Sequence, residues 1–342
     1  MRWWSWLFLP FAILYDSVTR IRNYFFDKEI LDSIKFETNV ISVGNLSVGG
    51  TGKTPMVEYL IRLITNEHND ITTLSRGYGR KTYGFKMAGA LDDANSLGDE
   101  PYMYHRKFGN AIGVAVCSNR DLAIPEILYY RPGTNVILLD DAFQHRVVNP
   151  SLSLLLTDYN KPFYKDFVLP AGRLRESRSG AKRADLIIVT KCPSLSDSDQ
   201  VQIKEKISTF SKSPIFFTRV GYDEPLPIFD EQPPLQKKIV GISGIANARP
   251  YNSYLEKTFK VKLLHNYRDH HQYSDLDVKH IVNELDRETS LICTEKDAVK
   301  LEKFEVLRKY SVYYLPIRTQ FLKDEALFQA IVTNSLKSFD DL

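Results

Sequence analysis

Cysteine is scarce in this sequence of 342 residues, which contains only Cys117, Cys192 and Cys293. Three cysteines that lie far apart argue against a disulfide framework and against a cysteine-based zinc site. We therefore expect a reducing, cytosolic environment. An excess of one charge is also missing, because 45 lysines and arginines face 42 acids and leave a formal net charge of +3. This balance gives no sign of a nucleic-acid-binding protein.

A long hydrophobic run is lacking as well, although the N-terminus is apolar. The tryptophans of the chain are Trp3, Trp4 and Trp6, and the apolar run that they open ends at Leu14. At about 1.5 Å per residue this run covers roughly 18 Å as a helix, too little for a hydrocarbon core of about 30 Å. A secretory signal peptide is disfavoured too, because only one cation precedes the run and a small-residue cleavage site is missing.

Tryptophan rings prefer the interface between bilayer and water, and cations follow the apolar run where anionic headgroups would attract them. We therefore predict that residues 1–28 form an interfacial helix that contacts a membrane surface. A helix that simply docks on the protein's own core is the alternative.

Residues 40–55 combine a buried strand, a glycine-rich turn and a helix start. In such a P-loop, small residues let consecutive backbone N–H groups close around phosphate oxygens. Lys53 would reach the β- and γ-phosphates, and the Thr54 hydroxyl can hold Mg²⁺. A turn without a ligand is the alternative, but it has no use for a Lys-Thr pair at the helix start. The predicted nucleotide-binding residues are Ser47, Val48, Gly49, Gly50, Thr51, Gly52, Lys53 and Thr54, with Ser47 where the strict pattern has glycine.

A second apolar strand, residues 135–139, ends in Asp140 and Asp141, which is the Walker B pattern. A strand beside the P-loop would let the first acid organise Mg²⁺ and leave the second acid for metal or for a proton. Another acid pair, Asp99 and Glu100, begins a predicted helix. Carboxylates are common there because they complement the helix dipole, so this pair has an ordinary explanation as well.

Arginines recur at the ends of several predicted strands. Two loops, residues 76–81 and 169–178, are cation-rich, and their guanidinium groups suit an anionic second substrate. A solvated basic loop is the alternative. In the smaller half of the chain, His270 and His271 follow a strand. Their spacing does not suit zinc, so a proton-transfer or orienting role across a cleft is favoured over a plain surface loop.

The order of elements predicts a P-loop NTPase-like α/β fold, with a mostly parallel sheet covered by helices on both faces. The length favours two domains over one. Four prolines between residues 225 and 234 indicate a hinge, after which a second, smaller α/β domain begins. The predicted parts are an interfacial helix at 1–28, a P-loop domain at 29–220, a hinge at 221–236 and the smaller domain at 237–342.

Several segments together resemble one family, the tetraacyldisaccharide 4′-kinases of lipid A biosynthesis. The family also has serine or threonine at the position of Ser47, whereas Arg173 stands where many members carry proline. The segments that carry the resemblance are 42–55, 74–80, 98–101, 138–146, 170–176, 269–270 and 294–301.

The resemblance implies phosphoryl transfer from ATP with Mg²⁺ to the 4′-hydroxyl of a tetraacylated glucosamine disaccharide 1-phosphate. It implies a membrane-embedded lipid A precursor as partner, at the cytoplasmic face of an inner membrane, without nucleic acid or an obligate protein partner. Asp99 paired with His270 would be the base, with Lys53 on the phosphates and Asp141 as the alternative base. The implied metal residues are Thr54, Glu100 and Asp140, and the substrate residues are Arg76, Arg120, Gln144, Arg146 and Arg175.

Two other functions stay open on the sequence. A P-loop ligase of the dethiobiotin-synthetase kind also joins a glycine-rich loop to a doubly wound sheet, but it would not need interfacial tryptophans. A nucleotide-gated membrane-targeting ATPase would release phosphate without an acceptor.

Overall fold

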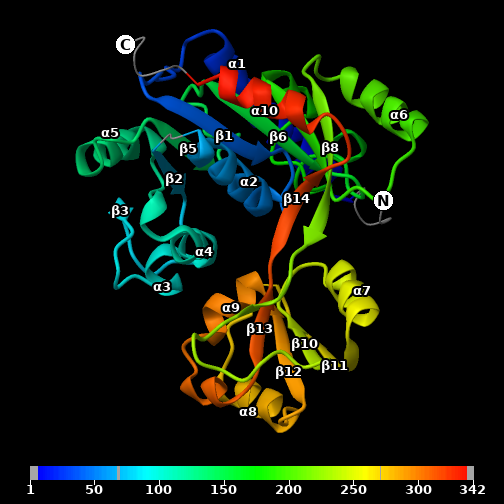
Figure 1. The fold of residues 1–342 in the computed structure, drawn as a ribbon. Coiled ribbons are helices and arrows are strands. Elements are labelled where there is room, and N and C mark those ends of the chain that lie inside the picture. The colour runs from blue at the N-terminus through cyan, green and yellow to red at the C-terminus, as the bar shows by residue number, and fades with distance from the viewer. Residues whose placement is uncertain (1–6, 68–69, 270, 337–342) are drawn as a thin grey trace.

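The structure is a computed structural model that describes residues 7–67, 70–269 and 271–336 (Figure 1). The three tryptophans and His270 lie outside the described residues. The predictions that rest on them therefore stay predictions.

Within the described residues, nine strands form a large sheet in the order β14-β8-β7-β6-β1-β5-β2-β4-β3. Neighbouring strands from β8 to β4 pair in parallel, while β14 and β3 are antiparallel edges. The central strands β1, β2, β5, β6 and β7 are buried along their whole length because helices cover both faces of the sheet. The strands are β1 (Asn39–Asn45), β2 (Ile71–Ser75), β3 (Lys86–Met87), β4 (Gly113–Val116), β5 (Val136–Asp140), β6 (Leu152–Asp158), β7 (Leu186–Thr190), β8 (Ile215–Tyr222) and β14 (Ile317–Phe321).

Alternate residues of β1 face opposite layers of helices. Ile41 and Val43 pack in the same core cluster as residues of α2 (Lys53–Asn66), α4 (Asp99–Phe108) and α10 (Glu325–Asn334). Val40 packs on the other face with residues of α5 (Arg120–Tyr130). A neighbouring cluster on β6 and β7 takes in α6 (Asp197–Ser208), and the short α3 (Ala94–Leu97) precedes α4. We call this sheet with its helices the large unit.

In the described part of the chain, a second sheet of five strands forms the small unit, with the order β11-β10-β12-β13-β9. All its pairings are parallel except that of β9. The architecture confirms the predicted fold class, a mostly parallel sheet with helices on both faces and a second, smaller α/β unit. The elements are β9 (Leu226–Pro227), β10 (Lys238–Ser243), β11 (Lys260–Asn266), β12 (Thr289–Thr294), β13 (Val312–Leu315), α7 (Arg249–Thr258), α8 (Asp275–Asn283) and α9 (Glu295–Leu301).

The end of the chain returns to the large unit, whereas the sequence prediction assigned all of 237–342 to the smaller domain. Strand β14 pairs with β8, and Phe328 and Val332 of α10 are buried in the main core of the large unit. Phe328 packs there against the aromatic rings of Tyr59 and Phe216. The small unit is therefore an insertion between β8 and β14, as the two long strands between the units in Figure 1 show.

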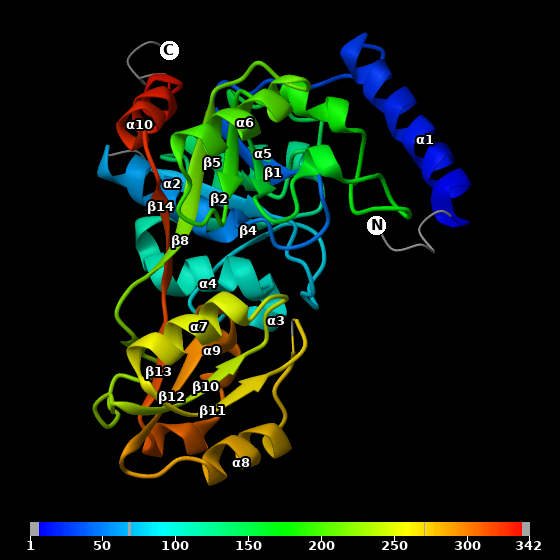
Figure 2. The same cartoon turned by 90° about the vertical axis from the view of Figure 1, so that its right-hand side faces the viewer.

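Helix α1 (Leu9–Asp27) stands along one side of the large unit (Figure 2). Only Ala12 and Phe26 of this helix are buried. Its exposed apolar side chains include Phe11, Ile13, Leu14, Val18, Ile21, Tyr24 and Phe25. Among the described residues, we find no helix with both the length and the apolar character to cross a bilayer.

Candidate active site

The glycine-rich turn connects the carboxyl end of β1 to the first residue of α2, Lys53. Gly49 and Gly52 have φ angles of +106° and +82°, a left-handed conformation that a side chain would strain. Among the described residues, no side chain caps the N-terminus of α2. Its first backbone N–H groups therefore remain available for an anion, and the helix dipole favours one there.

Ser47 has a role that the sequence did not suggest. Its backbone forms an antiparallel bridge with Leu174, and the Val48 N–H donates to the Arg173 carbonyl at 2.8 Å. The turn thus begins as a short extended segment paired with the loop at 167–176, and this conformation does not require glycine. The same pairing fixes the neighbouring Arg175 beside the P-loop.

The far end of the turn is held by the strand end at β7. Asn45 donates to the Thr51 hydroxyl and Thr190 donates to the Thr51 carbonyl, each at 2.7 Å. Lys191 donates to the carbonyl of Gly50 and also pairs with Asp158. Lys191 is therefore a site residue that the sequence prediction left out, although its position after a parallel strand was a usable signal.

Asp141 anchors two cations beside the P-loop. Lys53 Nζ lies 3.4 Å from its carboxylate, and both terminal nitrogens of Arg175 contact it at 2.9 to 3.1 Å. Burial raises the pKa of Asp141, but Lys53 and Arg175 outweigh burial and leave the pKa below its ordinary value. Both carboxylate oxygens of Asp141 contact these cations, so the geometry favours an anchoring role for it.

Asp140 is buried one residue earlier, at the end of β5. Tyr104 of α4 donates to its Oδ2 at 3.1 Å, whereas Oδ1 has no hydrogen-bond partner among the described residues. Burial, followed by the negative charge of Glu100, raises the pKa of Asp140 to about 7. A nearby cation would relieve this cost, so the unpartnered oxygen fits a metal or its water.

The described residues contain no cluster of three His, Cys, Asp or Glu side chains suited to a metal ion. Mg²⁺ at a kinase site needs only one or two carboxylates, because water and substrate phosphates supply the other ligands. Thr54, in the first turn of α2, and the acids Glu100 and Asp140 offer oxygen ligands of that kind. The residues present therefore fit Mg²⁺.

Asp99 and Glu100 begin α4, and two lysines of the small unit reach them. Lys300 Nζ lies 3.0 Å from Asp99, and Lys296 Nζ lies 2.5 Å from Glu100. Both lysines come from α9, so these ion pairs join the two units. The predicted pairing of Asp99 with His270 stays a prediction, because His270 lies outside the described residues.

Two of the predicted substrate residues, Arg76 and Arg120, differ in their exposure. Arg76 is exposed at the end of β2, while Arg120 is buried and donates to the carbonyls of Ser118 and Asp140 at 3.1 and 3.4 Å. Burial, and next the charge of Arg76, lowers the pKa of Arg120. These two arginines and Arg175 lie at the edge of the sheet that carries the P-loop, where an anionic substrate would meet them.

A family model described as tetraacyldisaccharide-1-P 4′-kinase matches residues 4–337. The chain belongs to this family. A relative from Flavobacterium johnsoniae, named tetraacyldisaccharide 4′-kinase, is 43% identical to this chain, and the match covers 97% of both chains. A relative of the same name from Parabacteroides distasonis is 39% identical, and the match covers 96% of this chain and 94% of the other. A solved LpxK structure from Aquifex aeolicus, described as in complex with ATP, matches with a TM-score of 0.78 at 28% identity and covers 97% of this chain and 99% of that one.

Membership in the 4′-kinase family confirms the resemblance drawn from the motifs and makes this protein a kinase. The dethiobiotin-synthetase-type ligase and the nucleotide-gated targeting protein find no support among these matches.

Gln144 and Arg146, which the resemblance implied as substrate residues of the kinase, have protein partners here. Gln144 donates to the Asn45 carbonyl at 2.8 Å and to Glu176 at 3.0 Å. Arg146 pairs with Asp27 of α1 at 2.8 Å. In this structure both side chains connect the P-loop region and α1 to the core.

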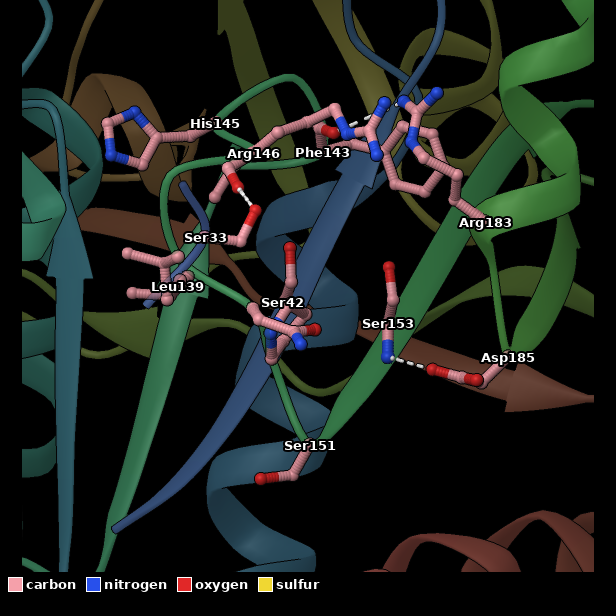
Figure 3. A pocket seen from close by; sticks show the side chains of 14 residues that line it. Ser33, Ser42, Leu139, Phe143, His145, Arg146, Ser151, Ser153, Arg183 and Asp185 are labelled. Carbon is pink, nitrogen blue, oxygen red and sulfur yellow. Dashed lines mark hydrogen bonds between the residues drawn. The ribbon is translucent and has the colours of Figure 1, made fainter. Parts of the chain in front are cut away.

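The kinase also has a polar cavity of about 320 Å³ behind the P-loop strand (Figure 3). Ser42 of β1 and Ser153 of β6 line it, and the backbone N–H of Ser153 donates to Asp185 at 2.8 Å. Arg146 also lines the cavity, between it and α1. None of the residues that line this cavity belongs to the phosphate-binding turn.

Proposed function

We propose that this kinase transfers the γ-phosphoryl group of ATP to the 4′-hydroxyl of a tetraacylated glucosamine disaccharide 1-phosphate. One observation carries the proposal. The P-loop lysine and the Walker acids lie beside α4: Lys53 contacts Asp141, Tyr104 in the middle of the helix contacts Asp140, and Asp99 and Glu100 begin the helix. A phosphate site and an acidic group for an incoming hydroxyl are thus combined at one edge of the sheet.

The donor side of the reaction uses the P-loop. The backbone N–H groups at 49–54 and the ammonium of Lys53 bind the phosphate oxygens of ATP. Thr54, Glu100 and Asp140 would hold Mg²⁺, which when bound neutralises charge that develops on the transferring group. Asp141 keeps Lys53 and Arg175 beside the phosphates through the ion pairs described for the site.

The acceptor side uses Asp99. A sugar hydroxyl is a poor nucleophile, so a base must take its proton as the new oxygen–phosphorus bond forms and the bond to the leaving ADP breaks. We assign Asp99 this role, with His270 as the residue that orients it. Arg76, Arg120 and Arg175 supply positive charge for the phosphate of the lipid acceptor.

We assign α1 the contact with the membrane that contains the acceptor. Its apolar side chains are exposed along the helix, which supports a position at the bilayer interface. The kinase would then act as a peripheral protein at the cytoplasmic face of the inner membrane, where ATP is available.

The test is an assay with γ-labelled ATP, Mg²⁺ and the disaccharide 1-phosphate lipid in mixed micelles. We expect labelled lipid with the parent protein and a loss of at least about a hundredfold in Lys53→Ala. Release of labelled phosphate without labelled lipid would contradict the proposal and would favour an ATPase.

A further inference from the structure

The contact between α4 and α9 is built from buried or half-buried ion pairs. Besides Asp99 with Lys300 and Glu100 with Lys296, Lys107 of α4 pairs with Glu295 of α9 at 2.6 Å. All three pairs cross from the large unit to the small unit. Only one of them, Glu100 with Lys296, uses a carboxylate that the proposed function assigns to the metal.

Lys296 stands among several acids of the site. Its ammonium lies 2.5 Å from Glu100 Oε1, and its charge also interacts with Asp269 and Asp140. The side chains of Lys296 and Glu100 are only 30% and 34% exposed, so water screens their attraction incompletely. One ammonium therefore compensates part of the negative charge that a divalent cation would compensate.

Lys296 and Mg²⁺ cannot both bind the Glu100 carboxylate without repelling each other. Mg²⁺ binds oxygen at about 2.0–2.1 Å and draws its ligands into an octahedral arrangement. An ammonium hydrogen-bonded to the same carboxylate would lie a few ångströms from the metal, and two like charges at that distance repel strongly in a half-buried site.

We propose that Lys296 is the counter-ion of Glu100 in the metal-free protein and that Mg²⁺ must displace it to bind. Lys296 is thus a positioning residue that links metal binding to the contact between α4 and α9. When the metal is bound, the pairs of Lys300 with Asp99 and of Lys107 with Glu295 remain and keep α9 against α4. This inference rests on the proposed role of Glu100 as a metal ligand.

The experiment measures Mg²⁺ binding to the full-length Lys296→Met variant. Thermal unfolding is followed while MgCl₂ is titrated at a saturating, fixed concentration of β,γ-methylene ATP. Without Mg²⁺ we expect a lower Tm than in the parent, because Glu100 and Asp140 have lost a counter-charge. We expect the half-saturating Mg²⁺ concentration to fall by about two- to fivefold, as for the loss of a partly exposed ion pair. An unchanged or higher value would overturn the proposal.

Two controls make the result specific. Lys303→Met removes a charge that lies beyond the end of α9, over the Phe304 ring, and should leave the Mg²⁺ midpoint unchanged. Lys296→Arg keeps the charge and should leave the Mg²⁺ midpoint close to that of the parent. If Lys296→Met does not fold, Lys296→Gln carries the same prediction.

Glu100→Gln separates failure of this inference from failure of the proposed function. If Glu100 is a metal ligand, this variant raises the Mg²⁺ midpoint, and adding Lys296→Met to it lowers the midpoint by less than Lys296→Met does in the parent, because only the interaction of Lys296 with Asp140 is left to remove. If Glu100→Gln leaves the midpoint unchanged, Glu100 does not hold metal and the metal assignment itself fails. If Glu100→Gln raises the midpoint but Lys296→Met leaves it unchanged, only the role of Lys296 is wrong.

Discussion

Asp99 is the residue on which the proposed chemistry depends most. It begins α4, where its carboxylate lies 3.0 Å from the nearly buried ammonium of Lys300. This ion pair holds the carboxylate in place at the start of α4, and a base must be positioned before it can accept a proton.

Asp99→Asn should therefore lose turnover and keep nucleotide binding. The amide has nearly the same shape but cannot accept the proton, so we expect kcat to fall by about 10² to 10⁴. The Kd for ATP, measured by calorimetry, should change by less than about threefold, because the P-loop is intact. A large loss of ATP affinity would instead indicate that Asp99 holds metal or structure.

Residues that act within one stretch of chain could be predicted from the sequence, and residues that act across the fold could not. The P-loop needs only Lys53, Thr54 and the neighbouring glycines, which are contiguous. Lys296 and Lys300 face Asp99 and Glu100 only because α9 packs on α4, about two hundred positions away in the chain. Their spacing of four residues predicts that both lysines lie on one face of a helix, but the sequence does not show which helix packs against that face.

At the scale of elements, α1 combines an attached side and an exposed apolar side. Its attachment is largely polar: Tyr15 donates to the Arg175 carbonyl at 2.8 Å, Asn23 donates to Glu176 at 2.7 Å, and Arg146 pairs with Asp27. The family resemblance implied Arg146 as a substrate residue, whereas its partner in the structure is Asp27 of α1. The carboxylate that pairs with Arg146 depends on where α1 packs, and only the folded structure shows this.

The exposed side of α1 predicts membrane binding. Leu14 and Val18 are 65% and 59% exposed and lie one helical turn apart. The double change Leu14→Glu and Val18→Glu should reduce binding to anionic phospholipid vesicles by about tenfold or more, since it puts charge on apolar area that the bilayer would otherwise bury. Co-sedimentation with vesicles measures the change.

A matched control comes from the small unit, where Leu276 at the start of α8 is 70% exposed. Leu276→Glu should leave vesicle binding unchanged, because the small unit is not expected to meet the membrane. Equal loss in both variants would mean that vesicle binding reflects general surface hydrophobicity and not α1.

At the scale of the whole molecule, the small unit is inserted into the large one and the chain passes between them twice, before β9 and after β13. The four prolines lie between the end of β8 and the start of β10, where the chain passes to the small unit, whereas its return could not be predicted from the sequence. Residues 317–334 have the same alternation of strand and helix as the small unit, and only the pairing of β14 with β8 shows where they belong.

The two units also meet in a cluster whose charge depends on pH. Glu58 of α2 and Glu295 of α9 share the ammonium of Lys107 at 2.5 and 2.6 Å, with Arg62 3.9 Å from Glu58. Burial and next the charge of Glu295 raise the pKa of Glu58 from 4.5 to about 7, although Lys107 opposes both. Glu58 therefore binds its proton more tightly in the folded protein than in the unfolded chain.

Stability should consequently fall as the pH rises through this range. Between the ordinary pKa of Glu58 and about 7, the folded state carries more protons than the unfolded state, so the free energy of unfolding decreases with increasing pH. Glu58→Gln cannot ionise and should lose this contribution, which is on the order of 1 to 3 kcal/mol. The Tm of Glu58→Gln should then decline less than that of the parent from about pH 5 to pH 8, and the difference should reach several degrees in thermal scans at each pH.

Glu126→Gln, on the exposed surface of α5, should keep the slope of the parent. Parallel curves for Glu58→Gln and the parent would show that the cluster joining the two units does not titrate in this range.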